Sequence, residues 1–199
     1  MLKNRSRDGN SIARFDSTPT GIYIIDPVRS MLGFSFRHAA ISDIRGKFNS
    51  FEGLLKLDAA RPYRSEAYMS VQTGSLETGN RQRDEHLKGP DFFDSATFPL
   101  LTCRSIGFEY AGNEGLRLIG DVRIRDIELP IAIDLKFGST TQEAAGRERV
   151  ECEGRAALKP SDWGLISNTP LHAGGVRVSN EISLVMDISA VRVFQAPPA

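Results

Sequence analysis

Residues 116–137 read LRLIGDVRIRDIELPIAIDLKF and give the clearest strand signal in the chain. From position 116 to position 124, apolar residues and glycine occupy every second place, and mostly charged residues fill the places between them. After a turn at Asp126, the alternation resumes and continues to Phe137. A period of two is typical of a strand that buries one face and exposes the other. The segment therefore predicts an antiparallel β-hairpin that contributes one apolar face to a core.

The same alternation recurs along most of the chain. It is found over residues 21–26, 32–38, 48–57, 66–72, 150–158 and 182–189, and residues 100–110 are extended with ambiguous facing. The apolar parity changes between Phe48 and Phe51, which predicts a bulge near Asn49 and Ser50. Only residues 81–88, between a candidate N-cap at Asn80 and the pair Gly89-Pro90, indicate a helix. Seven or eight strands with short turns predict one all-β domain, a barrel or a sandwich.

A closed barrel suits these strands, because closure leaves no exposed sheet edge. An eight-stranded barrel has an interior that side chains can fill or that one small ligand can occupy. The inward faces combine large and small residues: Phe34, Phe36, Phe137, Gly53, Gly120, Gly154 and Ala156. That mixture is compatible with a filled core and equally with a tunnel along the glycines. The sequence leaves both arrangements open.

Composition excludes several classes of protein. The chain has 199 residues, with 25 basic and 25 acidic side chains, so its formal net charge gives no support to general nucleic-acid binding. No apolar run reaches the roughly 18 residues of a membrane-spanning helix. Two cysteines without a metal-spaced Cys/His cluster exclude a disulfide scaffold and a zinc finger. We expect no cofactor.

The two ends of the chain differ in character from its middle. The first 20 residues are polar and lack the apolar core of a signal peptide. We therefore expect a disordered leader over residues 1–20, a barrel domain over 21–194, a tail over 195–199 and a cytoplasmic location with both thiols reduced.

The histidines provide the main catalytic candidates. The chain contains only His38, His86 and His172, and none belongs to a known catalytic or metal-binding motif. Asp84 and His86 would diverge by about 200° around a helix, so no metal site is predicted there. His38 ends an inward apolar face. It is either a core histidine bonded to backbone or a polar group that meets a ligand head group, and a role as catalytic base has the least support.

The charged residues 81–88 and the aromatic pair that follows them have two interpretations. The helix is either a solvated surface element or a plug over one mouth of the barrel. Phe92 and Phe93 favour the plug, since buried rings would anchor the helix there.

An ordered set of motifs points to a family. The most specific block is Thr78-Gly79-Asn80-x-x-Arg83-Asp84-x-His86-Leu87-Lys88-x-x-Asp91-Phe92-Phe93-Asp94, followed by Phe98-Pro99. Others are Tyr23-Ile24-Ile25-Asp26-Pro27, Gly33-Phe34-Ser35-Phe36-Arg37-His38, Arg45-Gly46-Lys47-Phe48, Phe51-Glu52-Gly53, Gly120-Asp121-Val122, Leu129-Pro130 and Gly174-Gly175-Val176. Over about residues 21–193 the chain resembles the YceI-like family of lipocalin-like polyisoprenoid-binding proteins. Residues 163–180 depart from the family pattern, so we expect a differently shaped mouth.

The resemblance implies a lipocalin-like, eight-stranded antiparallel barrel that holds a long isoprenoid chain, with the short helix beside one mouth. The expected function is non-catalytic binding that sequesters or transports a long-chain isoprenoid lipid, such as a polyisoprenoid quinone. Transient membrane contact and a homodimer also fit. The alternatives are an enzyme that acts on such a lipid at the mouth and a structural barrel without ligand. We expect the lining residues to be Phe34, Phe36, Leu55, Met69, Leu118, Val122, Ile133, Leu135, Phe137 and Leu184, with His38 as the polar contact.

Overall fold

The hairpin at residues 116–137 forms as the alternation predicts. The computed structural model describes residues 20–38, 42–111, 115–143, 146–165 and 178–193. In it, β8 (Gly115–Ile124) pairs antiparallel with β9 (Ile127–Gln142), and Ile124 stands opposite Ile127. Arg125 and Asp126 make the turn between them. On the outer face Arg117 pairs with Asp134 at 2.7 Å, an exposed ion pair of the kind that contributes less than about 1 kcal/mol.

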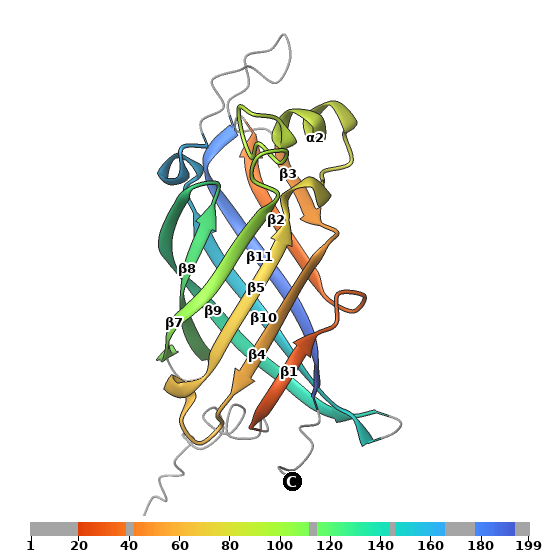
Figure 1. The fold of residues 1–199 in the computed structure, drawn as a ribbon, viewed down its shortest axis with the longest axis vertical. Helices are drawn as coiled ribbons and strands as arrows, with labels where there is room; N and C mark the ends of the chain where they lie inside the picture. Colours follow the sequence, from red (N-terminus) through yellow and green to blue (C-terminus); the bar gives the residue numbers. More distant parts are fainter. Residues whose placement is uncertain (1–19, 39–41, 112–114, 144–145, 166–177, 194–199) are drawn as a thin grey trace, which may run out of the picture.

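The sheet closes on itself into an eight-stranded antiparallel barrel (Figure 1). Its order is β1-β4-β5-β7-β8-β9-β10-β11, and β1 also pairs with β11. The strands β2, β3 and β6 continue the sheet from β11. The bounds of the remaining strands are β1 Gly21–Ile25, β2 Met31–His38, β3 Ser42–Phe48, β4 Phe51–Leu57, β5 Glu66–Gln72, β6 Leu76–Glu77, β7 Leu100–Ala111, β10 Glu148–Leu158 and β11 Val178–Arg192. The predicted fold class is confirmed.

At three places in the barrel wall, two strands that follow each other in the chain together fill the place of one strand. These pairs are β1 with β2, β3 with β4, and β5 with β6. Strand β11 pairs with β1 near Arg192 and with β2 near Leu184, and β3 and β4 pair with β2 and β1 in the same way. The bulge predicted near Asn49 and Ser50 is instead a break between two strands, β3 and β4, and the rings of Phe48 and Phe51 on either side are both buried.

Strand β7 contains a bulge, which explains why the sequence did not show which of its side chains face inward. Leu101 and Cys103 face the interior, and so does Phe108, although its position has the opposite parity. The register with β8 shifts between Ser105 and Gly107. One extra residue at that bulge moves the following side chains to the other face of the strand.

The predicted helix is α2 (Arg81–Lys88), and it lies at one end of the barrel beside β3 (Figure 1). The side chain of Asn80 accepts a hydrogen bond from the backbone N–H of Arg83 and caps the first turn, as predicted. Short 3₁₀ turns occupy Pro62–Arg64, Thr73–Ser75 and Pro160–Trp163. We refer below to the α2 end of the barrel and to the opposite end.

A buried arginine in β10 links that strand to the connection between β1 and β2. Arg149 points out of the barrel wall, yet it is only 5% exposed. Its guanidinium contacts Asp26 at 3.0 Å, Glu143 at 2.7 Å and the hydroxyl of Ser189 at 2.8 Å. The hydrogen bond from Arg149 lowers the pKa of Glu143. Burial raises the pKa of Asp26, but hydrogen bonds from Arg149 and the backbone outweigh that effect and leave this pKa below its ordinary value.

Candidate functional site

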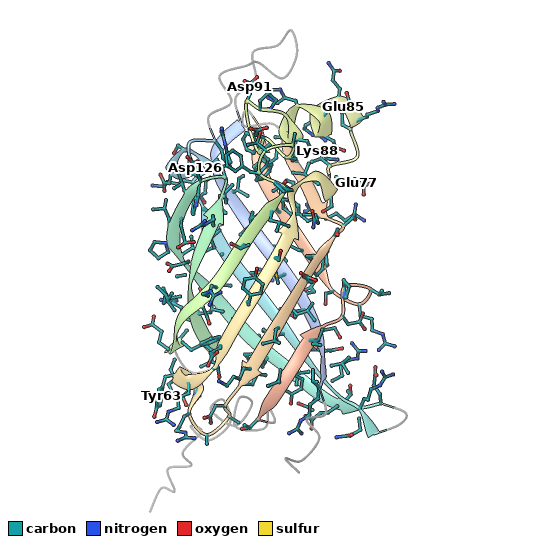
Figure 2. The ribbon with its side chains drawn as sticks, viewed as in Figure 1. Tyr63, Glu77, Glu85, Lys88, Asp91 and Asp126 are labelled. Atoms are coloured by element: carbon teal, nitrogen blue, oxygen red, sulfur yellow. The ribbon has the colours of Figure 1, made fainter. Side chains whose placement is uncertain are left out.

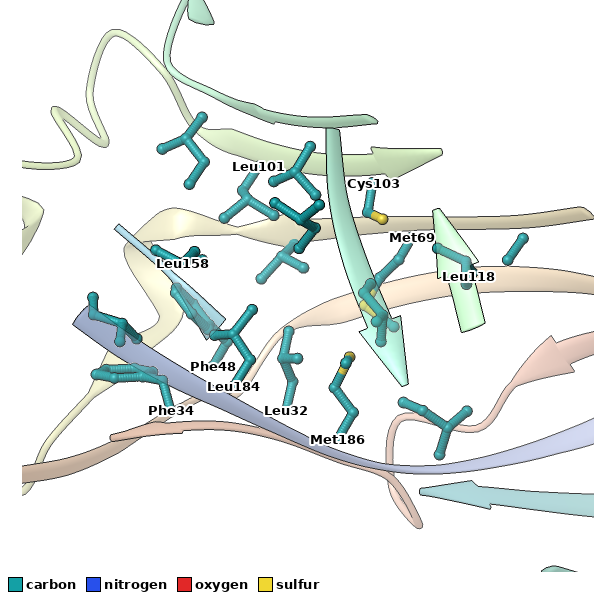
Figure 3. Close-up of a pocket in the computed structure, with 18 of the residues that line it drawn as sticks. Leu32, Phe34, Phe48, Met69, Leu101, Cys103, Leu118, Leu158, Leu184 and Met186 are labelled. Atoms are coloured by element: carbon teal, nitrogen blue, oxygen red, sulfur yellow. The ribbon is translucent and has the colours of Figure 1, made fainter. Parts of the chain in front are cut away.

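The interior of the barrel holds a cavity of about 150 Å³. All eight wall positions contribute to its lining, because every strand turns its apolar face inward. Figure 3 shows Leu32, Met69, Leu118, Leu184 and Met186 around this space. Apart from Tyr68 and two cysteines, the lining side chains are hydrocarbons or thioethers. Such a surface can hold an apolar ligand and offers no compensation for a buried charge.

The structure places nearly all the predicted ligand-binding residues on this lining. They are Phe34, Phe36, Leu55, Met69, Leu118, Val122, Ile133, Leu135, Phe137 and Leu184. Contact with a ligand stays a prediction for each of them. The backbone of His38 pairs with Ser42 and Val178 at the α2 end, and the side chain of His38 lies outside the described part, so its predicted contact also stays a prediction.

The chain after β6 closes the cavity at the α2 end. We call residues 81–99 the closing segment. Leu87, Phe92 and Phe93 from this segment line the cavity and are almost fully buried. The aromatic pair was predicted to anchor the helix, and its burial confirms that placement. The sequence did not predict that Phe92 and Phe93 line the cavity, because residues 89–99 show no periodicity that would indicate which side chains face inward.

A row of phenylalanine rings connects the barrel wall to the closing segment. Phe34 stacks on Phe36 with centroids 6.4 Å apart, and it also meets Phe48 at 5.6 Å. Phe48 in turn meets the edge of Phe93 at 6.0 Å, and Phe93 meets Phe92 at 5.0 Å. Edge-to-face pairs of this kind add about 0.5–1.5 kcal/mol beyond the area they bury. The row fixes the closing segment on the barrel.

The charged residues at the start of α2 serve to hold the local backbone. The carboxylate of Asp84 accepts hydrogen bonds from both the backbone N–H and the hydroxyl of Thr78. Arg83 donates to the hydroxyl of Thr78 at 2.8 Å and to its carbonyl at 3.0 Å. Within the described ranges, no group of three or more His, Cys, Asp and Glu side chains is arranged to hold a metal ion. These contacts support a structural role for the most specific motif.

The inward glycines are covered by larger neighbours, so no tunnel follows them. A Cβ atom added at Gly154 would lie 2.9 Å from the methyl carbon of Met186. One added at Gly120 would lie 2.8 Å from a methyl carbon of Leu118. The sequence left a filled core and a tunnel open. The structure has filled space beside the glycines and a separate cavity within the barrel.

Two thiols face the cavity. Burial, the larger cause, together with the nearby carboxylate of Asp121 raises the pKa of Cys103 to about 11. Burial raises the pKa of Cys152 to about 12. Both cysteines are free, and their raised pKa values favour the protonated thiol over the nucleophilic thiolate at neutral pH.

The opposite end of the barrel interior is polar. The buried hydroxyl of Tyr23 donates to Glu148 at 2.6 Å, and Arg192 contacts the same carboxylate oxygen at 3.3 Å. Burial and the hydrogen bond to Glu148 raise the pKa of Tyr23. Leu55, which lies opposite Tyr23 in the neighbouring strand, lines the cavity. The apolar space therefore ends before this internally paired cluster.

Comparison with known proteins relates this barrel to others. A family model described as a YceI-like domain matches residues 23–190. A UPF0312 protein of Vibrio cholerae is 30% identical over 145 residues, which cover 72% of this chain and 77% of the relative. A UPF0312 protein of Azotobacter vinelandii is 26% identical over 172 residues, covering 85% of this chain and 86% of the relative.

Solved structures share the fold. BcnA of Burkholderia cenocepacia superposes with a TM-score of 0.73 at 18% identity and covers 83% of this chain and 98% of its own. A polyisoprenoid-binding domain from Saccharophagus degradans superposes with a TM-score of 0.65 at 16% identity, covering 86% and 98%. Among the described residues, no helix is long and apolar enough to cross a membrane. Because the family model spans most of the chain, the protein belongs to the family defined by the YceI-like domain.

Proposed function

We propose that this protein binds a long-chain isoprenoid lipid inside its barrel and sequesters or carries it without chemical change. The observation that carries the proposal is the internal cavity, whose lining is almost entirely hydrocarbon and comes from every wall position. The structural similarity to a polyisoprenoid-binding domain supports the same ligand class.

The energetics favour an apolar chain. Each methylene group removed from water contributes about 0.8 kcal/mol, so a few isoprene units offset a large part of the cost of association. A lipid of this kind has a very low concentration in water. The barrel therefore competes with membranes for its ligand, and transfer between membranes is a natural use of such binding.

The size of the cavity sets a requirement on the bound state. A dry cavity of about 150 Å³ holds one aromatic ring, whereas a long isoprenoid needs several times that space. The lining must therefore move when the lipid enters. Met69 and Met186 are suited to this movement, because unbranched thioether side chains adapt to irregular spaces at little cost.

The proposed absence of catalysis rests on the lining. It offers two protonated thiols, and it presents no paired acid and base to a bound chain. Cytoplasmic location, membrane contact and a homodimer remain predictions from the sequence.

A vesicle transfer assay tests the proposal. Donor vesicles contain a labelled polyisoprenoid quinone, acceptor vesicles contain none, and the purified full-length protein is added. We expect transfer to accelerate with protein concentration and the recovered lipid to have unchanged mass. Phe137→Asp places a carboxylate in the lining and should abolish transfer, whereas the outward Lys136→Asp should not. Transfer by a folded Phe137→Asp protein, or a chemically altered lipid, would contradict the proposal.

A further inference from the structure

Two buried polar atoms lack a partner, and both lie at the α2 end. Among the described residues, the only buried side-chain nitrogen or oxygen atoms without a hydrogen bond are Nε of Arg125 and Oγ of Ser95. Arg125 makes the turn between β8 and β9, and Ser95 belongs to the closing segment. In Figure 2, Asp126, which follows Arg125 in the chain, and Asp91 of the closing segment both lie toward the α2 end. A buried donor without an acceptor destabilises the protein, and a ligand that supplies the acceptor would remove that cost.

The backbone is strained at the same two places. In the part of the chain that the structure describes, Arg125 and Asp94 are the only residues other than glycine with positive φ, at 57° and 46°. Residues other than glycine rarely adopt a positive φ. Backbone strain of this kind is concentrated at binding sites. Arg125 carries one of the unpartnered donors, and Asp94 directly precedes Ser95, which carries the other.

One aromatic side chain brings the two places together. The guanidinium carbon of Arg125 lies 5.5 Å from the ring centroid of Phe98. The backbone N–H of Phe98 donates to the carbonyl of Asp94 at 2.8 Å, so Arg125 rests on the turn that carries Ser95. The cavity begins next to both, because Ile124 and Phe93 line it.

We propose that Arg125 and Ser95 bind the polar head group of the lipid, and that the head group is an uncharged oxygen acceptor such as a quinone carbonyl. This inference rests on the proposed function. Both side chains can donate hydrogen bonds, which calls for an acceptor on the ligand. The head group then lies at the α2 end, and the isoprenoid tail points toward Tyr23.

The surrounding charges favour an uncharged head group over a phosphate. Asp94 precedes Ser95, and Asp126 follows Arg125. Within the described residues no ion pair joins Arg125 to either carboxylate. Each donor residue adjoins an acidic residue in the chain, so the two carboxylates outweigh the single positive charge of Arg125 and oppose the binding of a phosphate. A carbonyl oxygen satisfies the donors without this penalty.

Binding measurements on delipidated full-length protein test the assignment. The probes share one tail: a menaquinone with a geranylgeranyl chain, geranylgeranyl diphosphate and the corresponding hydrocarbon. Trp163, the single tryptophan, donates its indole N–H to the carbonyl of the cavity residue Val122, so quenching of its fluorescence reports the bound quinone. The other two probes are measured by displacement of the quinone. The variants are Arg125→Met, Ser95→Ala and the control Arg123→Gln, whose side chain is exposed and paired with Glu128.

We expect Arg125→Met to raise the Kd of the quinone about tenfold or more, with a smaller rise for Ser95→Ala. The Kd of the hydrocarbon should stay unchanged in both variants, and Arg123→Gln should match wild type. Equal weakening of quinone and hydrocarbon, no weakening of either, or tighter binding of the diphosphate than of the quinone would overturn the assignment. If Arg125→Met fails to fold, Ser95→Ala decides by the same comparison. Failure of the wild type to bind any probe would instead contradict the proposed function.

Discussion

At the scale of single residues, large side chains use the space above glycines in neighbouring strands. Phe34 of β2 lies opposite Gly46 of β3, and a Cβ atom added at Gly46 would come within 2.3 Å of the phenyl ring. The ring then stacks on Phe36 and contacts Phe48. The position of the aromatic row therefore depends on the absence of a side chain at Gly46.

Gly46→Ala should destabilise the protein by about 1–3 kcal/mol, because the methyl group displaces a packed ring. The free energy of unfolding in urea measures the effect. Gly33→Ala is a matched control on the opposite strand, since its added Cβ atom would lie 3.5 Å from the nearest atom. Equal stability of the Gly46→Ala protein and the wild type would show that Phe34 has another position available.

A second substitution tests the cavity itself. Gly154→Val should push Met186 and Leu135 into the cavity and lower lipid binding while the fold persists. Gly138→Val is the control, because its added Cβ atom meets only Glu151 at 3.6 Å, an ordinary contact distance. Lipid retained per protein after purification is the measurement. Unchanged retention in Gly154→Val would place the ligand elsewhere.

The cavity thiols predict a dependence on pH. Both thiols have pKa values raised by burial, to about 11 for Cys103 and about 12 for Cys152. Their protonated forms stabilise the fold fully below the pKa of an unfolded thiol, about 8.5, and this contribution is lost as the pH rises toward the folded values. The free energy of unfolding should therefore fall as the pH rises from about 8.5 to about 11. Replacing both cysteines by alanine should reduce that fall, and an identical fall in the variant would contradict the assignment to these groups.

At the scale of elements, the closing segment seals the α2 end of the barrel. Phe93 joins the closing segment to Phe48, and Leu87 seals the same end. The salt-bridged side of α2, where Arg81 meets Glu85 at 2.9 Å, faces water and contributes little to stability. The buried rings therefore determine whether this end of the barrel stays closed.

Phe93→Ala should cost about 3–5 kcal/mol and accelerate lipid exchange, because it removes the anchor of the closing segment. His86→Ala should cost about 1 kcal/mol or less and leave exchange unchanged. Thermal unfolding and lipid exchange, measured in parallel, compare the two variants. Slow exchange in Phe93→Ala would argue for entry at the opposite end. A chemical turnover of lipid that His86→Ala abolishes would favour the enzyme alternative.

At the scale of the whole molecule, period-two patterning predicted most of the barrel. The facing of Phe34, Leu118 and Phe137 followed from alternation alone, because each strand divides apolar core from water. Alternation failed at β7, where a bulge reverses the parity before Phe108. It also failed for Arg149, an outward charged residue that becomes buried only when distant segments fold over it.

The site was less predictable than the wall. The strand pattern identified the apolar lining, but Leu87 and Phe92 reach the cavity from a segment without period-two alternation. The unpartnered atoms of Arg125 and Ser95 depend on the meeting of a turn with the closing segment, a contact between residues far apart in the sequence. Local patterns therefore predict which surfaces face inward, and only tertiary contacts reveal how the ends are closed.

The central claim is that the barrel holds a long apolar lipid. Native mass spectrometry of freshly purified wild-type protein, followed by solvent extraction and analysis of the released lipid, tests it most directly. We expect an adduct with the mass of one isoprenoid lipid per barrel, recovered intact, present in Gly138→Val and depleted in Gly154→Val. A wild-type protein that carries no lipid and takes none up from vesicles would contradict the claim and leave a structural barrel.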